Sequence, residues 1–179
     1  MDGHKLAKGY IQVYTGNGKG KTTAALGLAL RAVGRELRVC MIQFVKGCEP
    51  CGEHIAAKRL APCFTLVQMG HKGWLAGGEP DAEAVGMARK AFRMAREAVR
   101  GSVYDLVILD EINTAVSHGL VSVVELLELM REKAHCVELV LTGRNAAPEV
   151  IEAADLVTEM REVKHYYRAG VAARIGIEK

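Results

Sequence analysis

A glycine-rich segment near the start of the chain has the residue types that bind a polyphosphate. Residues 15–23 read TGNGKGKTT, which fits the P-loop pattern G-x-x-x-x-G-K-[ST] except that Thr15 replaces the first glycine. Glycines let backbone N–H groups approach phosphate oxygens, and a following helix directs its positive end at the same point. We therefore expect a nucleotide-binding loop formed by Gly16, Asn17, Gly18, Lys19, Gly20, Lys21, Thr22 and Thr23.

Three side chains of this loop have distinct expected roles. Lys21 would bring a positive charge to the phosphate chain, and the hydroxyl of Thr22 would ligate Mg²⁺. The nearby Lys19 either contacts phosphate or lies in solvent. The loop is therefore expected to contribute both a cation and a metal ligand to the site.

A pair of acids later in the chain fits the metal side of such a site. Residues 106–109 are apolar, as in a buried strand, and Asp110 and Glu111 follow them directly. A carboxylate at a strand end beside a P-loop can hold Mg²⁺ directly or through water. We predict that Glu111 takes the role closer to the metal and that Asp110 supports it. In a hydrolase, Glu111 would also orient an attacking water.

Two further groups leave alternatives open. Arg144 follows a predicted strand, where it would contact phosphate or ribose or form a structural ion pair. Cys48, Cys51, His54 and Cys63 would together supply a tetrahedral zinc site, or the cysteines are free thiols of a loop.

Alternating strands and helices must position these groups. Strands are predicted at residues 10–15, 37–44, 64–68, 104–109, 136–142 and 156–160. Helices are predicted at residues 22–33, 53–60, 81–100, 121–133 and 147–153. This alternation indicates an α/β fold with a mostly parallel sheet and helices on both faces, which binds ligands at the carboxyl ends of its strands. We expect a single domain over 1–179, with a short tail at 1–8 and a C-terminal block at 161–179.

Two of the predicted helices differ in character. Residues 22–33 are apolar nearly all round, which predicts a buried helix. The helix at 81–100 has an apolar stripe formed by Val85, Ala88, Phe92, Ala95 and Val99. It also has a row of arginines at Arg89, Arg93, Arg96 and Arg100. We interpret this row as a solvated face, with a subunit contact as the alternative.

The composition excludes several classes of protein. The chain has 179 residues, of which half are hydrophobic, as suits one globular domain and not a disordered chain. A net charge of +3 does not favour nucleic-acid binding, and no apolar run approaches the roughly 20 residues that cross a membrane. The first residues lack a signal-peptide core and the five cysteines are an odd number, so we expect a cytoplasmic protein with reduced thiols.

The motifs together resemble those of one family, the P-loop ATP:corrinoid adenosyltransferases, also called cob(I)yrinic acid a,c-diamide adenosyltransferases. The blocks that carry the resemblance are TGNGKGKTTAA at 15–25, RAVG at 31–34, IQFVKG at 42–47, VILDE at 107–111, LTGR at 141–144 and VKHYYRAGVAARIGIE at 163–178. The resemblance implies a RecA-like P-loop fold. It implies transfer of the 5′-deoxyadenosyl group of ATP to the Co(I) of cobalamin or cobyrinic acid diamide, with release of triphosphate. It further implies Mg²⁺ or Mn²⁺, a homodimer, and an electron-donating reductase such as a flavoprotein.

The loop that would meet the corrin departs from the family pattern. Residues 70–80 read GHKGWLAGGEP, whereas members of the family often carry GFTWE. The resemblance makes Trp74 a corrinoid-contacting residue, and His165 of the C-terminal block either lines the corrin pocket or packs structurally. Two other functions stay open, a RecA-like ATPase in which Glu111 activates water and a nucleotide-dependent switch without catalysis.

Overall fold

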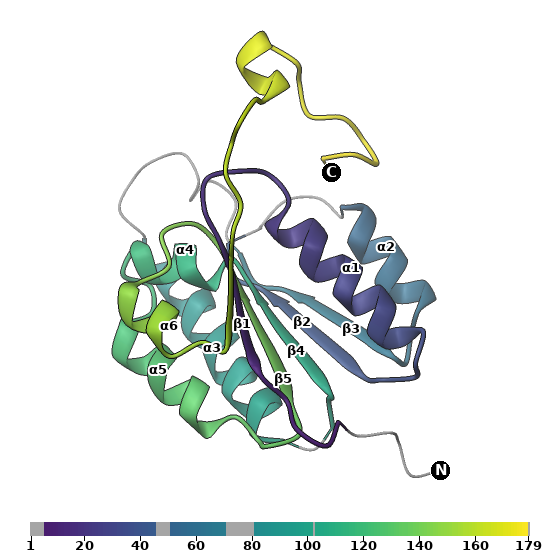
Figure 1. Cartoon of the computed structure of the whole chain (residues 1–179), viewed down its shortest axis with the longest axis vertical. Helices are drawn as coiled ribbons and strands as arrows, with labels where there is room; N and C mark the ends of the chain where they lie inside the picture. Colours follow the sequence, from purple (N-terminus) through teal and green to yellow (C-terminus); the bar gives the residue numbers. More distant parts are fainter. Residues whose placement is uncertain (1–5, 46–50, 71–80, 102, 179) are drawn as a thin grey trace.

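The strands assemble into one parallel sheet (Figure 1). The computed structural model describes residues 6–45, 51–70, 81–101 and 103–178. Six strands lie in the order β3-β2-β4-β5-β1-β6, and every neighbouring pair is parallel. Their bounds are β1 Ile11–Thr15, β2 Val39–Gln43, β3 Phe64–Gln68, β4 Leu106–Asp110, β5 Glu138–Thr142 and β6 Leu156–Glu159. The predicted parallel sheet is confirmed.

Helices cover both faces of this sheet, as the alternating pattern predicts (Figure 1). On one face lie α1 Lys21–Val33 and α2 Gly52–Arg59. On the other face lie α3 Ala82–Arg100, α4 Ile112–Ser117, α5 Val123–Glu132 and α6 Pro148–Glu152. A 3₁₀ helix, Tyr166–Ala169, lies in the C-terminal segment that runs past the end of the sheet. Within the described ranges, no helix is long and apolar enough to cross a membrane.

The central strand β4 separates two apolar cores. Successive side chains of a strand point to opposite faces of the sheet. Leu106 and Ile108 therefore pack in the core beneath α1 and α2, while Val107 and Leu109 pack in the core beneath the helices of the other face. All four are at most 2% exposed. This double burial explains why the strand is apolar at every position up to Asp110.

The prediction that α1 is buried all round is wrong. The helix turns a narrow stripe of small residues to the sheet, formed by Ala25, Ala29 and Ala32, whereas Leu30 on the outer side is 62% exposed. A helix that covers one face of a sheet at the outside of a domain has solvent on its far side, whatever residues it carries there.

The long helix α3 begins at the N-cap Asp81, whose carboxylate accepts a hydrogen bond from Ala84 N–H at 2.7 Å. Most of its predicted apolar stripe is buried, although Val85 is 39% exposed. The row of arginines is largely exposed, as predicted, and Arg96 and Arg100 in addition form ion pairs with Glu132 of α5. Arg89 likewise pairs with Glu125. These partly exposed pairs join α3 to α5, and each adds little stability.

The start of α5 gives the first testable prediction. Ser122 Oγ accepts from Glu125 N–H at 3.2 Å, and Glu125 Oε2 accepts from Ser122 N–H at 2.9 Å, which makes a capping box. We expect Ser122→Ala to lower the free energy of unfolding by about 1 kcal/mol, because a helix N–H loses its acceptor. Ser122→Gly should lose only a few tenths of a kcal/mol. Urea denaturation of the three proteins measures both values, and equal losses would contradict this role of the hydroxyl.

The same box should make stability depend on pH. Hydrogen bonds from the backbone and then the hydroxyl of Ser122, followed by the charge of Arg89, hold the pKa of Glu125 below its ordinary value. A carboxyl whose pKa is lowered on folding stabilises the folded state above its unfolded pKa and loses that contribution as pH falls through the folded pKa. The difference between wild type and Ser122→Ala should therefore shrink below about pH 4.

Candidate active site

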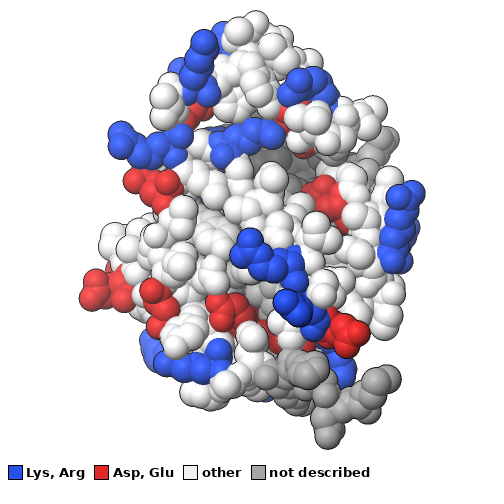
Figure 2. Space-filling model, turned by 45° about the vertical axis from the view of Figure 1, so that its right-hand side comes forward, with Lys and Arg blue, Asp and Glu red and all other residues white. Residues whose placement is uncertain are grey.

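A cavity of about 760 Å³ lies at the carboxyl ends of the strands and continues along α1 and α2. Its floor is the loop between β1 and α1, and its walls include the start of α2, Glu111 and Arg144. The C-terminal segment closes the opposite side with Glu162, His165 and Tyr167. In Figure 2 this segment stands above the body of the molecule with a recess beneath it, and basic side chains are interspersed with acidic ones on this face.

The glycines of the loop are required by the backbone and by a close neighbour. Gly16 and Gly20 have φ values of 92° and 123°, which side-chain-bearing residues rarely adopt. Gly18 N–H donates to Met160 O at 2.7 Å, just after β6. A Cβ at Gly16 would lie 2.4 Å from the same oxygen, and one at Gly18 would lie 2.8 Å from it. Packing of the chain after β6 on this loop was not visible in the sequence pattern.

Lys21 is folded back into the loop that precedes it. Only 7% of the residue is exposed, and its Nζ donates to Gly16 O at 2.7 Å and Gly18 O at 2.8 Å. Burial lowers the pKa of Lys21, while the negative charge of Glu111 opposes this effect. The ammonium group is therefore held at the base of the cavity, where a bound anion would meet it.

Asp110 is the centre of a buried polar network. Its residue is fully buried, and Oδ1 accepts from Thr22 Oγ1 at 2.9 Å and from Thr142 Oγ1 at 2.7 Å. Oδ2 accepts from Gln43 Nε2 at 3.2 Å. Strand β5 lies between β1 and β4, so its terminal Thr142 can bridge the phosphate loop and the acid pair. The structure thus brings together Thr22 and Asp110, two of the residues predicted to hold Mg²⁺.

Glu111 points to a different neighbour. It has the left-handed φ of 62°, and its N–H donates to Thr142 Oγ1 at 2.9 Å. Its carboxylate accepts a hydrogen bond from Thr114 Oγ1 and lines the cavity. The two adjacent acids thus differ in setting, since Asp110 is enclosed beneath the loop while Glu111 borders the open space.

Comparison with known proteins identifies the kind of enzyme that has this site. The model of the family "ATP:corrinoid adenosyltransferase BtuR/CobO/CobP" matches residues 7–178. The chain belongs to this adenosyltransferase family. It is 39% identical to a corrinoid adenosyltransferase of Sinorhizobium sp over 96% of this chain and 80% of that protein. It is 37% identical to the corrinoid adenosyltransferase of Escherichia coli (strain K12) over 96% of this chain and 86% of that one.

A solved structure supports the fold of this adenosyltransferase independently. The flagellar accessory protein FlaH from Methanocaldococcus jannaschii superposes with a TM-score of 0.57 at 13% identity, covering 86% of this chain and 72% of FlaH. At that identity the likeness concerns the fold alone. It agrees with the RecA-like arrangement expected from the sequence.

The remaining predicted ATP contacts of the adenosyltransferase lie around the same cavity. Asn17, Lys19, Thr23 and Arg144 all line it. Arg144 is exposed, its N–H donates to Thr114 Oγ1 at 3.1 Å, and no carboxylate of the described ranges lies within 4.0 Å of its guanidinium. The structural ion pair considered for Arg144 is therefore not found in the described part of the chain.

The C-terminal segment brings His165 to the cavity from the side opposite the loop. His165 Nδ1 accepts from Tyr167 N–H at 3.0 Å, which anchors the imidazole at the start of the 3₁₀ helix. Lys19 Nζ lies 3.5 Å from Ile177 O and 3.8 Å from the carboxylate of Glu178. The last residues of the segment thus reach back to the phosphate loop, a long-range contact without a signal in the sequence. Trp74 lies outside the described residues.

The four-ligand zinc site considered from the sequence is not assembled as predicted. Cys51 precedes α2 at the cavity end of the sheet, whereas Cys63 comes just before β3 at the opposite end. An eight-residue helix spans about 12 Å, which separates the two sulfurs. Cys48 lies outside the described residues, and Cys51 and His54 lie together with Glu53 instead.

Proposed function

We propose that this protein transfers the 5′-deoxyadenosyl group of ATP to the Co(I) centre of a reduced corrinoid, either cobalamin or cobyrinic acid diamide. The proposal rests on one observation, a family match over residues 7–178 in a chain whose phosphate loop, acid pair and C-terminal segment line one cavity. That cavity is large enough for a nucleotide and lies where ligands bind in parallel sheets.

The proposed reaction does not require the protein to act as a general base. Co(I) donates an electron pair to C5′ of the ribose as the C5′–O bond breaks, and that bond's electrons leave with the triphosphate. Cobalt ends as Co(III), and no proton has to be removed to create the nucleophile. The chain's task is therefore to align the two substrates and to stabilise the charge of the leaving group.

The loop residues fit this task. Residues 17–21 of the loop line one end of the cavity, and Lys21 lies among them. On triphosphate binding, we expect its ammonium to exchange the carbonyls of Gly16 and Gly18 for phosphate oxygens. Arg144 is available for the phosphates or the ribose from the opposite wall.

The oxygen donors around Thr22 fit Mg²⁺ or Mn²⁺. The Thr22 hydroxyl and the carboxylates of Asp110 and Glu111 are hard ligands, and the buried Asp110 already orients that hydroxyl. In our proposal Glu111, at the cavity, would hold the metal more directly, and Asp110 would position Thr22. The metal, when bound, supplies positive charge for the triphosphate.

The corrinoid would enter between the loop and the C-terminal segment. His165 lines this space, and Trp74 belongs to the glycine-rich stretch that the resemblance assigns to the corrin. We further propose, as the sequence resemblance implies, a homodimer and an electron-donating reductase such as a flavoprotein, with the reaction in the cytoplasm.

Replacement of Trp74 should impair the use of the corrinoid more than the binding of ATP. We expect Trp74→Ala to lower kcat/KM for the corrinoid about tenfold, the loss of a well-packed aromatic contact, with little change in the Kd for ATP. Steady-state rates at varied corrinoid and equilibrium ATP binding measure the two effects. Equal losses for both substrates would assign Trp74 a structural role.

A product assay tests the proposal as a whole. The purified protein is incubated with ATP, Mg²⁺, a corrinoid and a strong reductant. Adenosylcorrinoid and intact triphosphate are expected in equal amounts. Formation of ADP and inorganic phosphate would instead support the ATPase hypothesis. Nucleotide binding without any product would support a nucleotide-dependent switch without catalysis.

A further inference from the structure

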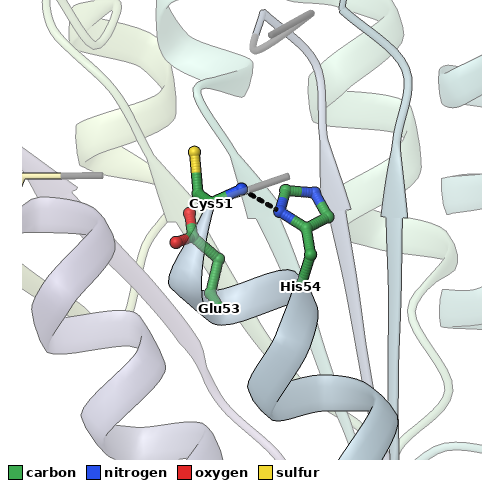
Figure 3. Close-up of side chains that lie close together, drawn as sticks. All are labelled: Cys51, Glu53 and His54. Carbon is green, nitrogen blue, oxygen red and sulfur yellow. Dashed lines mark hydrogen bonds between the residues drawn. The ribbon is translucent and has the colours of Figure 1, made fainter. Parts of the chain in front are cut away.

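Three potential metal ligands gather at the start of α2 (Figure 3). Cys51, Glu53 and His54 each present one ligand atom, and these atoms all lie within 4.8 Å of one another. Within the described ranges, no other group of three or more histidine, cysteine or acidic side chains is this close. All three residues are partly exposed, so an ion could reach them from solvent.

Hydrogen bonding fixes the tautomer of His54. Cys51 N–H donates to His54 Nδ1 at 3.1 Å, so Nδ1 carries the lone pair and the neutral ring bears its hydrogen on Nε2. That Nε2 atom is buried and has no hydrogen-bond partner in the described part of the chain. Nδ1, which is turned toward Cys51 in Figure 3, is therefore the nitrogen that an ion would bind, and the ion would have to displace the Cys51 N–H from it.

The sulfur is held in the same small space. The capping-box arrangement of α2 brings the Cys51 side chain toward the His54 N–H, which donates to Cys51 O at 3.0 Å. Glu53 extends from the first turn beside Cys51, and it lines the nucleotide cavity. A thiol, an imidazole and a carboxylate therefore converge from four consecutive residues on the first turn of one helix.

We propose that Cys51, Glu53 and His54 form a binding site for a divalent transition-metal ion, with Zn²⁺ as the best match. Sulfur, nitrogen and carboxylate oxygen are the ligands of zinc, and sites with three protein ligands leave the fourth position to water or another molecule. Ligand atoms around tetrahedral zinc lie about 3.3–3.8 Å apart, so side-chain rotations suffice to close this cluster. A thiolate and a carboxylate also balance the charge of the ion.

This site is chemically distinct from the one proposed for Mg²⁺. The set around Thr22 and Asp110 consists of oxygens, whereas sulfur and imidazole favour softer transition metals. The two sites are nevertheless neighbours, because Gln43 Nε2 donates to Glu53 Oε1 at 3.3 Å and to Asp110 Oδ2 at 3.2 Å. An ion at the cluster would compete with Gln43 for the carboxylate of Glu53.

Two substitutions separate metal binding from helix capping. The same contacts also cap α2, which by itself would explain why Cys51 and His54 lie together. Serine is a preferred N-cap residue, and glutamine at the third helical position can complete a capping box. Cys51→Ser and His54→Gln therefore preserve the cap while removing the thiolate and the imidazole.

The test titrates Co²⁺ into the reduced, chelator-treated full chain without ATP or corrinoid. Thiolate ligation gives Co²⁺ an absorption band in the near ultraviolet that oxygen ligands do not give, and Zn²⁺ should displace the ion. We expect one equivalent to bind, with the band lost in Cys51→Ser and affinity at least 100-fold weaker in His54→Gln. Cys63→Ser and Cys136→Ser should bind like wild type.

Several results would overturn the site. They are a band that persists in Cys51→Ser, a band lost only in the Cys63 or Cys136 variant, and no saturable binding by wild type. Circular dichroism melting checks that the two capping-preserving variants are folded. Because no substrate is present, the outcome is independent of whether the chain proves to be an adenosyltransferase. Cys48 lies outside the described residues and takes no part in this proposal.

Discussion

Lys21→Ala should lower the rate of adenosylcorrinoid formation by about 10²–10³-fold. The reason is that the reaction ejects a triphosphate, and a fixed donor at developing negative charge is worth about this factor. Lys21 is the loop cation held at the base of the cavity by Gly16 O and Gly18 O, so it needs little rearrangement to meet the leaving group. Initial rates with saturating ATP and corrinoid measure the effect.

A second lysine provides the matched control for this prediction. Lys90 is exposed on α3, away from the residues that line the cavity, so Lys90→Ala removes the same charge without touching the site. Its rate should stay within twofold of wild type. Near-normal turnover by Lys21→Ala in a folded protein would mean that the triphosphate binds elsewhere.

Local sequence features predicted much of the scaffold because they act within a few residues. β3 has the predicted bounds of 64–68, and α3 begins where Asp81 provides an N-cap and a periodic apolar stripe follows. The strand before Asp110 was recognisable because burial on both faces leaves no polar position. Glycine spacing likewise predicted the turn between β1 and α1.

Features set by tertiary contacts were not predictable in this way. The short helix α4 has no side-chain N-cap bond and begins from the left-handed Glu111, so its formation depends on packing beneath β5. The contact of Met160 with Gly16 and Gly18 joins residues about 140 positions apart. Phosphate binding alone therefore does not explain these glycines, because they also make room for the backbone of Met160.

Asp110 and Glu111 are a second case in which the motif predicted the residues but not their surroundings. The sequence placed Asp110 and Glu111 together at a metal site, and nothing in it distinguishes their surroundings. The structure distinguishes their surroundings. Asp110 is fully buried and accepts three hydrogen bonds, whereas Glu111 borders the cavity. Replacement of the two residues should therefore have different effects on stability and on activity.

Asp110→Asn should impair both stability and activity. An amide offers one acceptor oxygen where the carboxylate offers two, and its NH₂ group must face either the Gln43 amide donor or the hydroxyls of Thr22 and Thr142. A buried group left without a good partner costs about 1–3 kcal/mol of unfolding free energy. Because Thr22 also loses its orienting partner, the rate should fall about 100-fold.

Glu111→Gln provides the contrast that assigns the roles. Glutamine can still accept the hydrogen bond from Thr114, so unfolding free energy should change by less than about 0.5 kcal/mol. The amide is a poorer ligand for a hard cation, so the Mg²⁺ concentration for half-maximal rate should rise about tenfold. Urea denaturation and Mg²⁺ titrations of the two variants measure these differences. If Asp110→Asn alone shifted the Mg²⁺ requirement, the metal would belong to Asp110, and Glu111 would serve the cavity in another way.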